Sequence, residues 1–390
     1  MRIAILTSGI LPVPATRGGA VENLVDIYLE YNDKYRLHDI TIYSVADKAT
    51  KRHPALRSEK NHYRYIKTTS LLAKLKKALL RQSTGYYNYT IEYYLQVVIR
   101  QLRQKKYDVI IVENRPGFIL KLKEITNAKF VLHLHNDFLH RETKAANEIF
   151  DSFNCIVSVS GYITNRVKEI RPDNNKCKTV HNAIDNTCFH KAIPAERESI
   201  GISKDDFVIV YSGRLRKEKG ILELIQAIKR IKDIPNLKLL IIGANAYGKS
   251  QQPTPFIEQI KKESESIKNL ILFTGYIPYT QIPSYLKVAD IAVVPSMWEE
   301  PFGLTVVEAM AAGLPLITTR SGGIPEICEG VATIVNRDGI VNNLANAILD
   351  LYEHPEKRQN MAAVSLERAK LFDKETYAKN FFKALEEGLQ

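Results

Sequence analysis

The sequence predicts an α/β fold with two doubly wound domains, each built on a parallel sheet. Short apolar runs alternate with longer helical patterns along the 390 residues, which is typical of repeated strand-helix-strand units. At about 100–200 residues per domain, this length indicates two domains. The polar, irregular stretch 186–204 is the predicted hinge region, so the domains are assigned to residues 1–190 and 191–390.

Ten strands are expected, five in each domain. They are Arg2–Thr7, Ile40–Ser44, Val109–Val112, Phe130–Leu134 and Cys155–Val159, then Phe207–Tyr211, Leu239–Ile242, Ile271–Phe273, Ile291–Val294 and Leu316–Thr318. The last helical stretch, 374–389, follows the second series and can pack on either domain, including a return to the first. Open parallel sheets bind ligands outside the carboxyl ends of their strands, so a site is expected there.

The positive charge of the chain is concentrated in its first half. The formal net charge is +12, from 55 Lys+Arg and 43 Asp+Glu. Residues 1–190 hold 30 basic and 18 acidic side chains, residues 191–390 hold 25 of each, and residues 51–100 alone hold 11 and 2. This excess indicates an anionic partner, such as a phosphate-bearing substrate or an anionic membrane. A nucleic-acid partner is not expected, because the sequence has no zinc-finger or RNP motif.

The cysteines and the N-terminus indicate a reduced compartment. The four cysteines form no Cys-x-x-Cys pair, which argues against a zinc site and against a disulfide framework. The apolar run at Met1–Thr7 is too short for a signal peptide, and no stretch approaches the ~20 apolar residues of a spanning helix. We therefore expect a cytoplasmic protein whose contact with a membrane is at most peripheral.

The most informative segment runs from Pro295 to Met310. A strand ends at Ser296, a loop follows, and a helix begins near Gly303. Free backbone N–H groups and the positive end of the helix dipole make this junction suitable for a diphosphate. Glu300 on the loop and Glu308 in the helix can accept hydrogen bonds from the paired hydroxyls of a sugar and a ribose. Taken alone, the segment is explained equally well as a helix with an acidic first turn.

Two further loops favour a diphosphate site. The loop from Tyr211 to Gly220 follows the first strand of the second domain. Its Arg214 and Lys219 can converge on one diphosphate, Arg through its planar fork and Lys as a point charge. At Gly275–Pro278 the chain turns where a base can stack or meet backbone groups, which makes Tyr276 and Ile277 donor-binding candidates.

Together these motifs resemble the retaining nucleotide-sugar glycosyltransferases of family 4, whose GT-B fold has two facing Rossmann-like domains. The family's two glutamates separated by seven residues match Glu300 and Glu308, and its Gly-Arg-Leu…Lys-Gly element matches residues 213–220. The resemblance implies that Arg214 and Lys219 bind the donor diphosphate, Glu308 the ribose and Glu300 the transferred sugar. It extends the donor site to Phe302 and to backbone N–H groups of Gly303, Leu304 and Thr305.

In the first domain the resemblance implies two more elements of the site. Gly18 and Gly19 look like the family's glycine loop, and His135 matches its histidine that faces the transferred sugar. His133 is expected to be a packed neighbour on the same strand face. A metal is not expected, because no Cys or third His nearby completes a site, and no cofactor is expected. The predicted catalytic residues are His135, Arg214, Lys219 and Glu300, which act mainly by stabilising the departing diphosphate.

Residues 70–81 predict a basic amphipathic helix. Leu71, Leu72, Leu75, Ala78 and Leu79 share one face, while Lys74, Lys76, Lys77 and Arg81 lie largely off it. Five tyrosines follow that suit a membrane-water interface: Tyr86, Tyr87, Tyr89, Tyr93 and Tyr94. The sequence leaves three explanations open: docking on an anionic membrane, packing of the leucines on the first sheet, and binding of a phosphate-bearing acceptor.

The predicted function is hexosyl transfer, with retention and without a metal, from a nucleotide-diphosphate sugar to a glycan or lipid-linked acceptor. UDP is favoured over GDP as the nucleotide, and bacterial surface polysaccharide synthesis is the expected setting. The alternatives are a nucleotide-sugar epimerase on the same fold and a nucleotide- or sugar-binding protein without turnover. The set of donor-binding motifs favours transfer over both.

Overall fold

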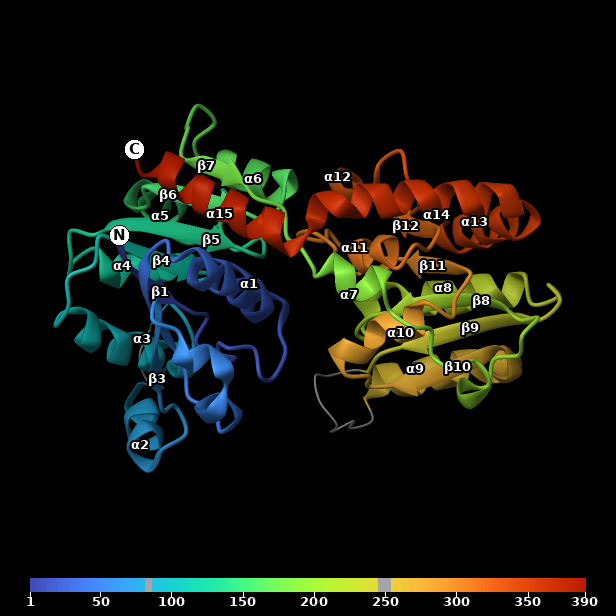
Figure 1. The fold of residues 1–390 in the computed structure, drawn as a ribbon, viewed down its shortest axis with the longest axis horizontal. Coiled ribbons are helices and arrows are strands. Elements are labelled where there is room, and N and C mark those ends of the chain that lie inside the picture. The colour runs from blue at the N-terminus through green and yellow to red at the C-terminus, as the bar shows by residue number, and fades with distance from the viewer. Residues whose placement is uncertain (81–85, 245–253) are drawn as a thin grey trace. The chain divides into compact units, whose positions relative to one another are not determined.

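The computed structural model describes residues 1–80, 86–244 and 254–390, which form two compact units (Figure 1). Unit 1 comprises Met1–Asn182 and Lys374–Gln390, and unit 2 comprises Ala183–Asp373. The chain therefore leaves unit 1 after Asn182 and returns to it at Lys374. No helix within the described ranges is long and apolar enough to cross a bilayer.

Unit 1 is built on a seven-stranded parallel sheet in the order β3-β2-β1-β4-β5-β6-β7. Its strands are β1 (Arg2–Leu6), β2 (Asp39–Val45), β3 (Asn61–Ile66), β4 (Val109–Glu113), β5 (Lys129–Leu134), β6 (Cys155–Ser158) and β7 (Cys177–Thr179). Its helices are α1 (Ala20–Tyr35), α2 (Leu71–Leu80), α3 (Tyr89–Leu102), α4 (Ile119–Leu122), α5 (Ala146–Ser152), α6 (Gly161–Lys168) and α15 (Lys374–Gly388).

Unit 2 is built on a six-stranded parallel sheet in the order β10-β9-β8-β11-β12-β13. Its strands are β8 (Phe207–Ser212), β9 (Leu237–Ile242), β10 (Ile271–Gly275), β11 (Ile291–Val294), β12 (Leu316–Thr319) and β13 (Thr333–Val335). Its helices are α7 (Asn186–His190), α8 (Ile221–Arg230), α9 (Pro255–Ser264), α10 (Ile282–Leu286), α11 (Leu304–Ala311), α12 (Ile324–Cys328), α13 (Ile340–Glu353) and α14 (Pro355–Ala369).

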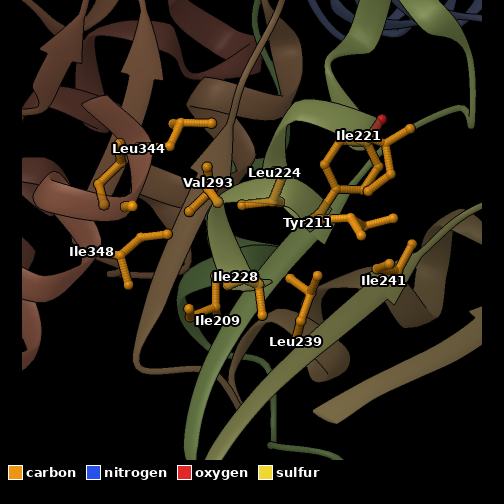
Figure 2. Close-up of a cluster of buried hydrophobic side chains, with 14 of the residues drawn as sticks. Ile209, Tyr211, Ile221, Leu224, Ile228, Leu239, Ile241, Val293, Leu344 and Ile348 are labelled. Atoms are coloured by element: carbon orange, nitrogen blue, oxygen red, sulfur yellow. The ribbon is translucent and has the colours of Figure 1, made fainter. Parts of the chain in front are cut away.

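The core of unit 2 shows why these segments form their elements. In α8, Ile221, Leu224, Ile225 and Ile228 recur at helical spacing and are buried. They pack against alternate side chains of β8 and β9 and against α13 (Figure 2), where the labelled residues include Ile209, Tyr211, Leu239, Ile241, Leu344 and Ile348. The strand residues are nearly all apolar because both faces of a parallel sheet are covered by helices.

The predicted pair of parallel, doubly wound sheets is confirmed, and all ten predicted strands are present. Three strands were not predicted: β3, β7 and β13. All three lie at sheet edges, and β7 and β13 have only three residues each. In β3 only Asn61 and Ile66, its first and last residues, are buried. A segment so short or so exposed carries little of the apolar pattern on which the prediction depended.

Helix α15 returns the end of the chain to unit 1. Its apolar face carries Tyr377, Phe381, Phe382 and Leu385, all buried. Phe381 stacks on Tyr28 of α1, with 4.4 Å between ring centroids, and Figure 1 shows α15 running beside β6. This packing explains why a segment that follows unit 2 in sequence belongs to the core of unit 1.

Candidate active site

The candidate residues of unit 2 lie on loops at the carboxyl ends of neighbouring strands. In the sheet, β8 has β9 on one side and β11 on the other, so the strand order reverses direction between β8 and β11. Ligands of open α/β sheets bind in the crevice at such a switch point. Arg214 and Lys219 follow β8, and Glu300 and Glu308 follow β11. Two of these four residues, Lys219 and Glu300, contact each other between the two loops.

The loop after β8 approaches the loop after β11 through a glycine. Gly220 caps α8 with φ of 71°, and a Cβ atom there would lie 1.8 Å from the carbonyl oxygen of Pro295. A side chain at this position would be both strained and in collision with backbone. The N–H of Met297 also donates to the carbonyl of Glu218, at 2.9 Å. The two loops therefore fit together only with glycine at this position.

Lys219 and Glu300 form an ion pair across these loops. Lys219 Nζ lies 2.5 Å from Glu300 Oε1, and the Ser296 hydroxyl donates to the same oxygen at 2.7 Å. Lys219 Nζ also lies 5.1 Å from the centroid of the Trp298 ring, within cation–π range. Glu300 is 6% exposed, and buried Ser296 and half-buried Lys219 hold its carboxylate in place. The cation expected on the phosphate and the carboxylate expected on the sugar are thus in direct contact.

Glu308 has a different environment from Glu300. It lies just over one turn into α11 and is 6% exposed. The hydroxyl of Tyr279 donates a hydrogen bond to its carboxyl group, which favours the ionised form. Burial has the larger and opposite effect and raises the pKa of Glu308 to about 7. A ligand that donates hydrogen bonds to the ionised carboxylate would therefore offset the cost of burying its charge.

The start of α11 and the loop after β10 supply the remaining donor-site candidates. Gly303 caps α11 with φ of 119°, and Leu304 and Thr305 in the first turn are half-buried. Phe302 is buried and packs edge-on against Phe372, at 5.8 Å between ring centroids, so its side chain belongs to the core. After β10, Tyr276 is 39% exposed and Ile277 is half-buried.

The glycine loop of unit 1 precedes α1 as expected. Gly18 and Gly19 have φ of 73° and 111°, and Gly19 caps the helix. A Cβ atom on Gly19 would lie 2.3 Å from the carboxylate of Glu22, which is buried and accepts a hydrogen bond from Ser8 at 3.3 Å. Around Gly18 there is open space within 4 Å. The positive φ favours glycine at both positions, and a side chain at Gly19 would also have to displace the Glu22 carboxylate.

A buried carboxylate in β4 joins the two histidines of β5. Glu113 lies 2.9 Å from His135 Nε2 and 3.2 Å from His133 Nδ1, and it accepts a hydrogen bond from the Tyr28 hydroxyl at 2.8 Å. Glu113 and His133 are 0% exposed and His135 is 6% exposed. The two imidazole rings lie 4.1 Å apart, as strand alternation predicts for positions i and i+2.

The charges in this cluster follow from its burial and contacts. Burial opposes ionisation of Glu113, but the two histidines outweigh it and hold the pKa of this carboxyl group below its ordinary range. Burial, followed by the neighbouring His133, lowers the pKa of His135 to about 4. His135 is therefore neutral at pH 7, with the proton on Nε2 directed at Glu113. Its Nδ1 atom is buried and has no hydrogen-bond partner.

Glu113 also completes a group of three side chains that can hold a metal ion, together with His133 and His135. The expectation of no metal counted only cysteine and histidine as further ligands, and it overlooked this carboxylate. Here the carboxylate accepts hydrogen bonds from both imidazoles and from Tyr28. These hydrogen bonds satisfy the Glu113 carboxylate without a metal ion.

Comparison with known proteins finds a family match within unit 2. Residues 192–367 match the model of the family described as glycosyl transferases group 1. Spore coat protein SA of Bacillus subtilis is 28% identical over 387 residues, covering 95% of this chain and 94% of that protein. The matched residues lie in unit 2, and these similarities support a glycosyltransferase.

Other similarities agree with this assignment. The lipopolysaccharide 1,2-N-acetylglucosaminetransferase of Salmonella typhimurium is 28% identical over 258 residues, covering 63% of this chain and 65% of that enzyme. Among solved structures, Anabaena Alr3699/HepE in complex with UDP superposes with a TM-score of 0.74 at 21% identity, over 99% of this chain and 100% of that one. The fold of this glycosyltransferase is therefore the GT-B fold.

Several residues that contact the candidate residues of each unit were not predicted. Ser296 and Tyr279 each donate a hydrogen bond to one of the two glutamates, and Glu113 holds the histidines of unit 1. Ser296 and Glu113 share a signal that could have identified them, because each is a polar residue at the carboxyl end of an apolar strand run. Tyr279 carries no such signal, since it reaches Glu308 only through the tertiary structure.

The predicted basic helix is present as α2, and one of its three open explanations is excluded. Helix α2 forms, but its leucines do not pack on the sheet: Leu71, Leu72, Leu75 and Leu79 are 60–80% exposed. The tyrosines expected at a membrane surface are largely internal instead, since Tyr94 is fully buried and the Tyr87 hydroxyl accepts a hydrogen bond from the N–H of Gly117 at 3.0 Å. Lys74 and Lys76 are exposed, Lys77 is half-buried, and Arg81 lies outside the described residues.

Proposed function

We propose that this glycosyltransferase is a retaining enzyme of family 4. It moves a hexosyl unit from a UDP-sugar to a glycan or lipid-linked acceptor, without a metal ion. The observation that carries the proposal is the preformed contact of Lys219, Glu300 and Ser296 at the switch point of unit 2. The same edge holds Arg214 and the N-terminus of α11.

This arrangement suits the departure of a nucleoside diphosphate. As the glycosidic bond breaks, negative charge grows on the leaving phosphate. Arg214, Lys219 and the backbone N–H groups at Gly303–Thr305 are groups of the type that stabilise such charge, and preorganised groups of this kind usually supply the largest catalytic contribution. Glu308 is buried with a pKa of about 7, so hydrogen bonds from the hydroxyls of a ribose would stabilise its ionised form. In a retaining reaction of this class, the leaving phosphate oxygen accepts the proton of the acceptor.

UDP is the first nucleotide to test, because the Anabaena protein with the same fold was solved with UDP and with UDP-glucose. The proposed acceptor class follows the Salmonella relative, whose name describes transfer to lipopolysaccharide. We place the enzyme in the cytoplasm, with a peripheral position at the inner face of the membrane and a role in bacterial surface polysaccharide synthesis.

The test compares Arg214→Ala with Arg216→Ala, a control on the same loop. Arg216 is half-exposed and lies 3.8 Å from Glu218. UDP-sugars and GDP-sugars are first screened for protection against thermal unfolding. Release of nucleoside diphosphate is then measured with the protecting donor. Arg214→Ala is expected to reduce turnover by about 100- to 1000-fold with an unchanged melting temperature, and Arg216→Ala by no more than about twofold.

Three results would contradict parts of the proposal. Near-normal turnover by a folded Arg214→Ala variant would contradict the role of Arg214 in diphosphate binding. Loss of activity in excess EDTA would contradict metal independence. A product of inverted anomeric configuration, read by NMR, would contradict retention. Interconversion of free nucleotide sugars without an acceptor would instead indicate an epimerase, and tight donor binding without turnover would indicate a binding protein.

A further inference from the structure

Helix α2 turns its apolar face away from the protein. Leu71, Leu72, Leu75 and Leu79 are 75%, 71%, 60% and 80% exposed, and Ala78 beside them is exposed as well. The helix follows the edge strand β3 and lies at one end of unit 1 (Figure 1). A contiguous apolar surface of this kind on a soluble domain usually marks an interaction site.

The opposite face of α2 holds the helix on unit 1. Ala73 is fully buried, and Lys77 and Leu80 are half-buried, at the spacing i, i+4 and i+7 of one helical face. This face packs on α3, and the Ser70 hydroxyl accepts a hydrogen bond from the N–H of Ala73 at 3.3 Å. The outward leucines are therefore not needed to attach the helix.

Lysines border the apolar face on both sides. At 100° per residue, the apolar side chains span an arc from Ala78 through Leu75 to Leu72. Lys74 lies about 40° beyond one end of this arc and Lys76 about 40° beyond the other. Both lysines are exposed. This arrangement lets the leucines enter an apolar layer while the ammonium groups stay at its charged surface.

We propose that α2 docks on the surface of an anionic lipid bilayer, with Leu71, Leu72, Leu75 and Leu79 in the boundary of the acyl chains and Lys74 and Lys76 among the headgroups. The charges on and near α2 favour a lipid surface over a second copy of the chain as its binding partner. The described helix has no acidic residue, and exposed Arg64 and Lys67 precede it, so two copies would bring like charges together. The inference rests on the peripheral membrane position proposed above and assigns its contact surface, and vesicle binding is measured without the transferase reaction, so either can fail alone.

The test measures cosedimentation of the full chain with lipid vesicles, in the absence of donor and acceptor. Binding is expected to vesicles of phosphatidylcholine with 30 mol% phosphatidylglycerol, to be far weaker with phosphatidylcholine alone, and to fall in 500 mM NaCl. Lys74→Gln/Lys76→Gln is expected to weaken binding about thirtyfold, and Leu75→Ser/Leu79→Ser at least roughly tenfold.

Matched controls come from unit 2. Leu371→Ser removes a leucine that is 64% exposed, and Lys261→Gln/Lys262→Gln removes two exposed lysines from α9. Both control proteins are expected to bind vesicles as the wild type does, and all variants to keep its melting temperature. The proposal is overturned if the α2 variants bind vesicles as the wild type does, if the protein binds neutral vesicles equally well, or if it binds no vesicles. A dimer that Leu75→Ser/Leu79→Ser abolishes, without vesicle binding, would assign the face to a second copy.

Discussion

Replacing Glu308 by Gln is expected to make the protein more stable at alkaline pH and to leave its stability nearly unchanged at acid pH. Burial raises the pKa of this carboxyl group from an ordinary 4.5 to about 7 in the folded protein. Between these two pH values the folded state therefore binds more protons than the unfolded state does. Stability consequently falls as the pH rises through this window.

The size of the effect follows from the difference between the two pKa values. At 1.36 kcal/mol per pKa unit, the difference between 4.5 and about 7 corresponds to about 3 kcal/mol. Glutamine does not titrate and resembles the protonated acid in shape. The free energy of unfolding of Glu308→Gln minus that of the wild type should therefore rise from near zero at pH 4.5 to about 3 kcal/mol at pH 8.

Urea unfolding at several pH values between 4.5 and 8 measures this difference, and all other titrating groups cancel between the two proteins. Glu258→Gln, on the exposed side of α9, controls for the removal of one negative charge. If the difference in unfolding free energy between the two proteins stays constant across the pH range, burial does not raise the pKa of Glu308. Calorimetry gives a second reading, because ribose hydroxyls that stabilise the ionised carboxylate should make UDP binding at pH 6 release about one proton.

Two further predictions concern the loops and the buried cluster. Gly220→Ala should lower the free energy of unfolding by several kcal/mol and abolish protection by UDP, because its Cβ would collide with the Pro295 carbonyl. The control is Gly339→Ala, at a position with a similar φ of 68° and open surroundings. It should lower the free energy of unfolding by only about 1 kcal/mol, as measured by urea unfolding. Equal costs for the two substitutions would show that the collision is relieved. Glu113→Gln should cost about 3 kcal/mol at pH 7, since two histidines and Tyr28 donate to the carboxylate, and an unchanged unfolding midpoint in urea would contradict this.

The sequence predicted the central strands better than the edges of the sheets, for a physical reason. Central strands are covered by helices on both faces, so Val109–Val112 and Ile291–Val294 are uninterrupted apolar runs. Edge strands need fewer apolar residues, and β3 was therefore missed although it pairs with six residues of β2. Helix α2 shows what apolar periodicity leaves open. Its apolar periodicity was recognised, but periodicity alone does not tell whether the apolar face meets the sheet or the solvent.

The candidate site divides in the same way between local and tertiary information. Spacing along the chain located the candidates, because Arg214, Lys219 and Glu300 lie on the loops that follow two strands and Glu308 lies in the helix after the second loop. Their partners were not predicted, because contact between the loops after β8 and β11 depends on which strands are neighbours in the sheet. Glu113 is the clearest case. It lies at the end of β4, and only the pairing of β4 with β5 brings it to His133 and His135.

In the sequence, Glu300 and Glu308 are two residues of the same type at a fixed spacing. In the structure, their electrostatic surroundings are opposite. Glu300 meets the cation of Lys219 and the hydroxyl of Ser296. Glu308 is buried against Tyr279, and its pKa rises to about 7. One carboxylate is thus paired before any ligand arrives, and the other is poised to ionise when a ligand donates hydrogen bonds to it. Since the residue type is the same, the difference arises entirely from the neighbours that the fold supplies.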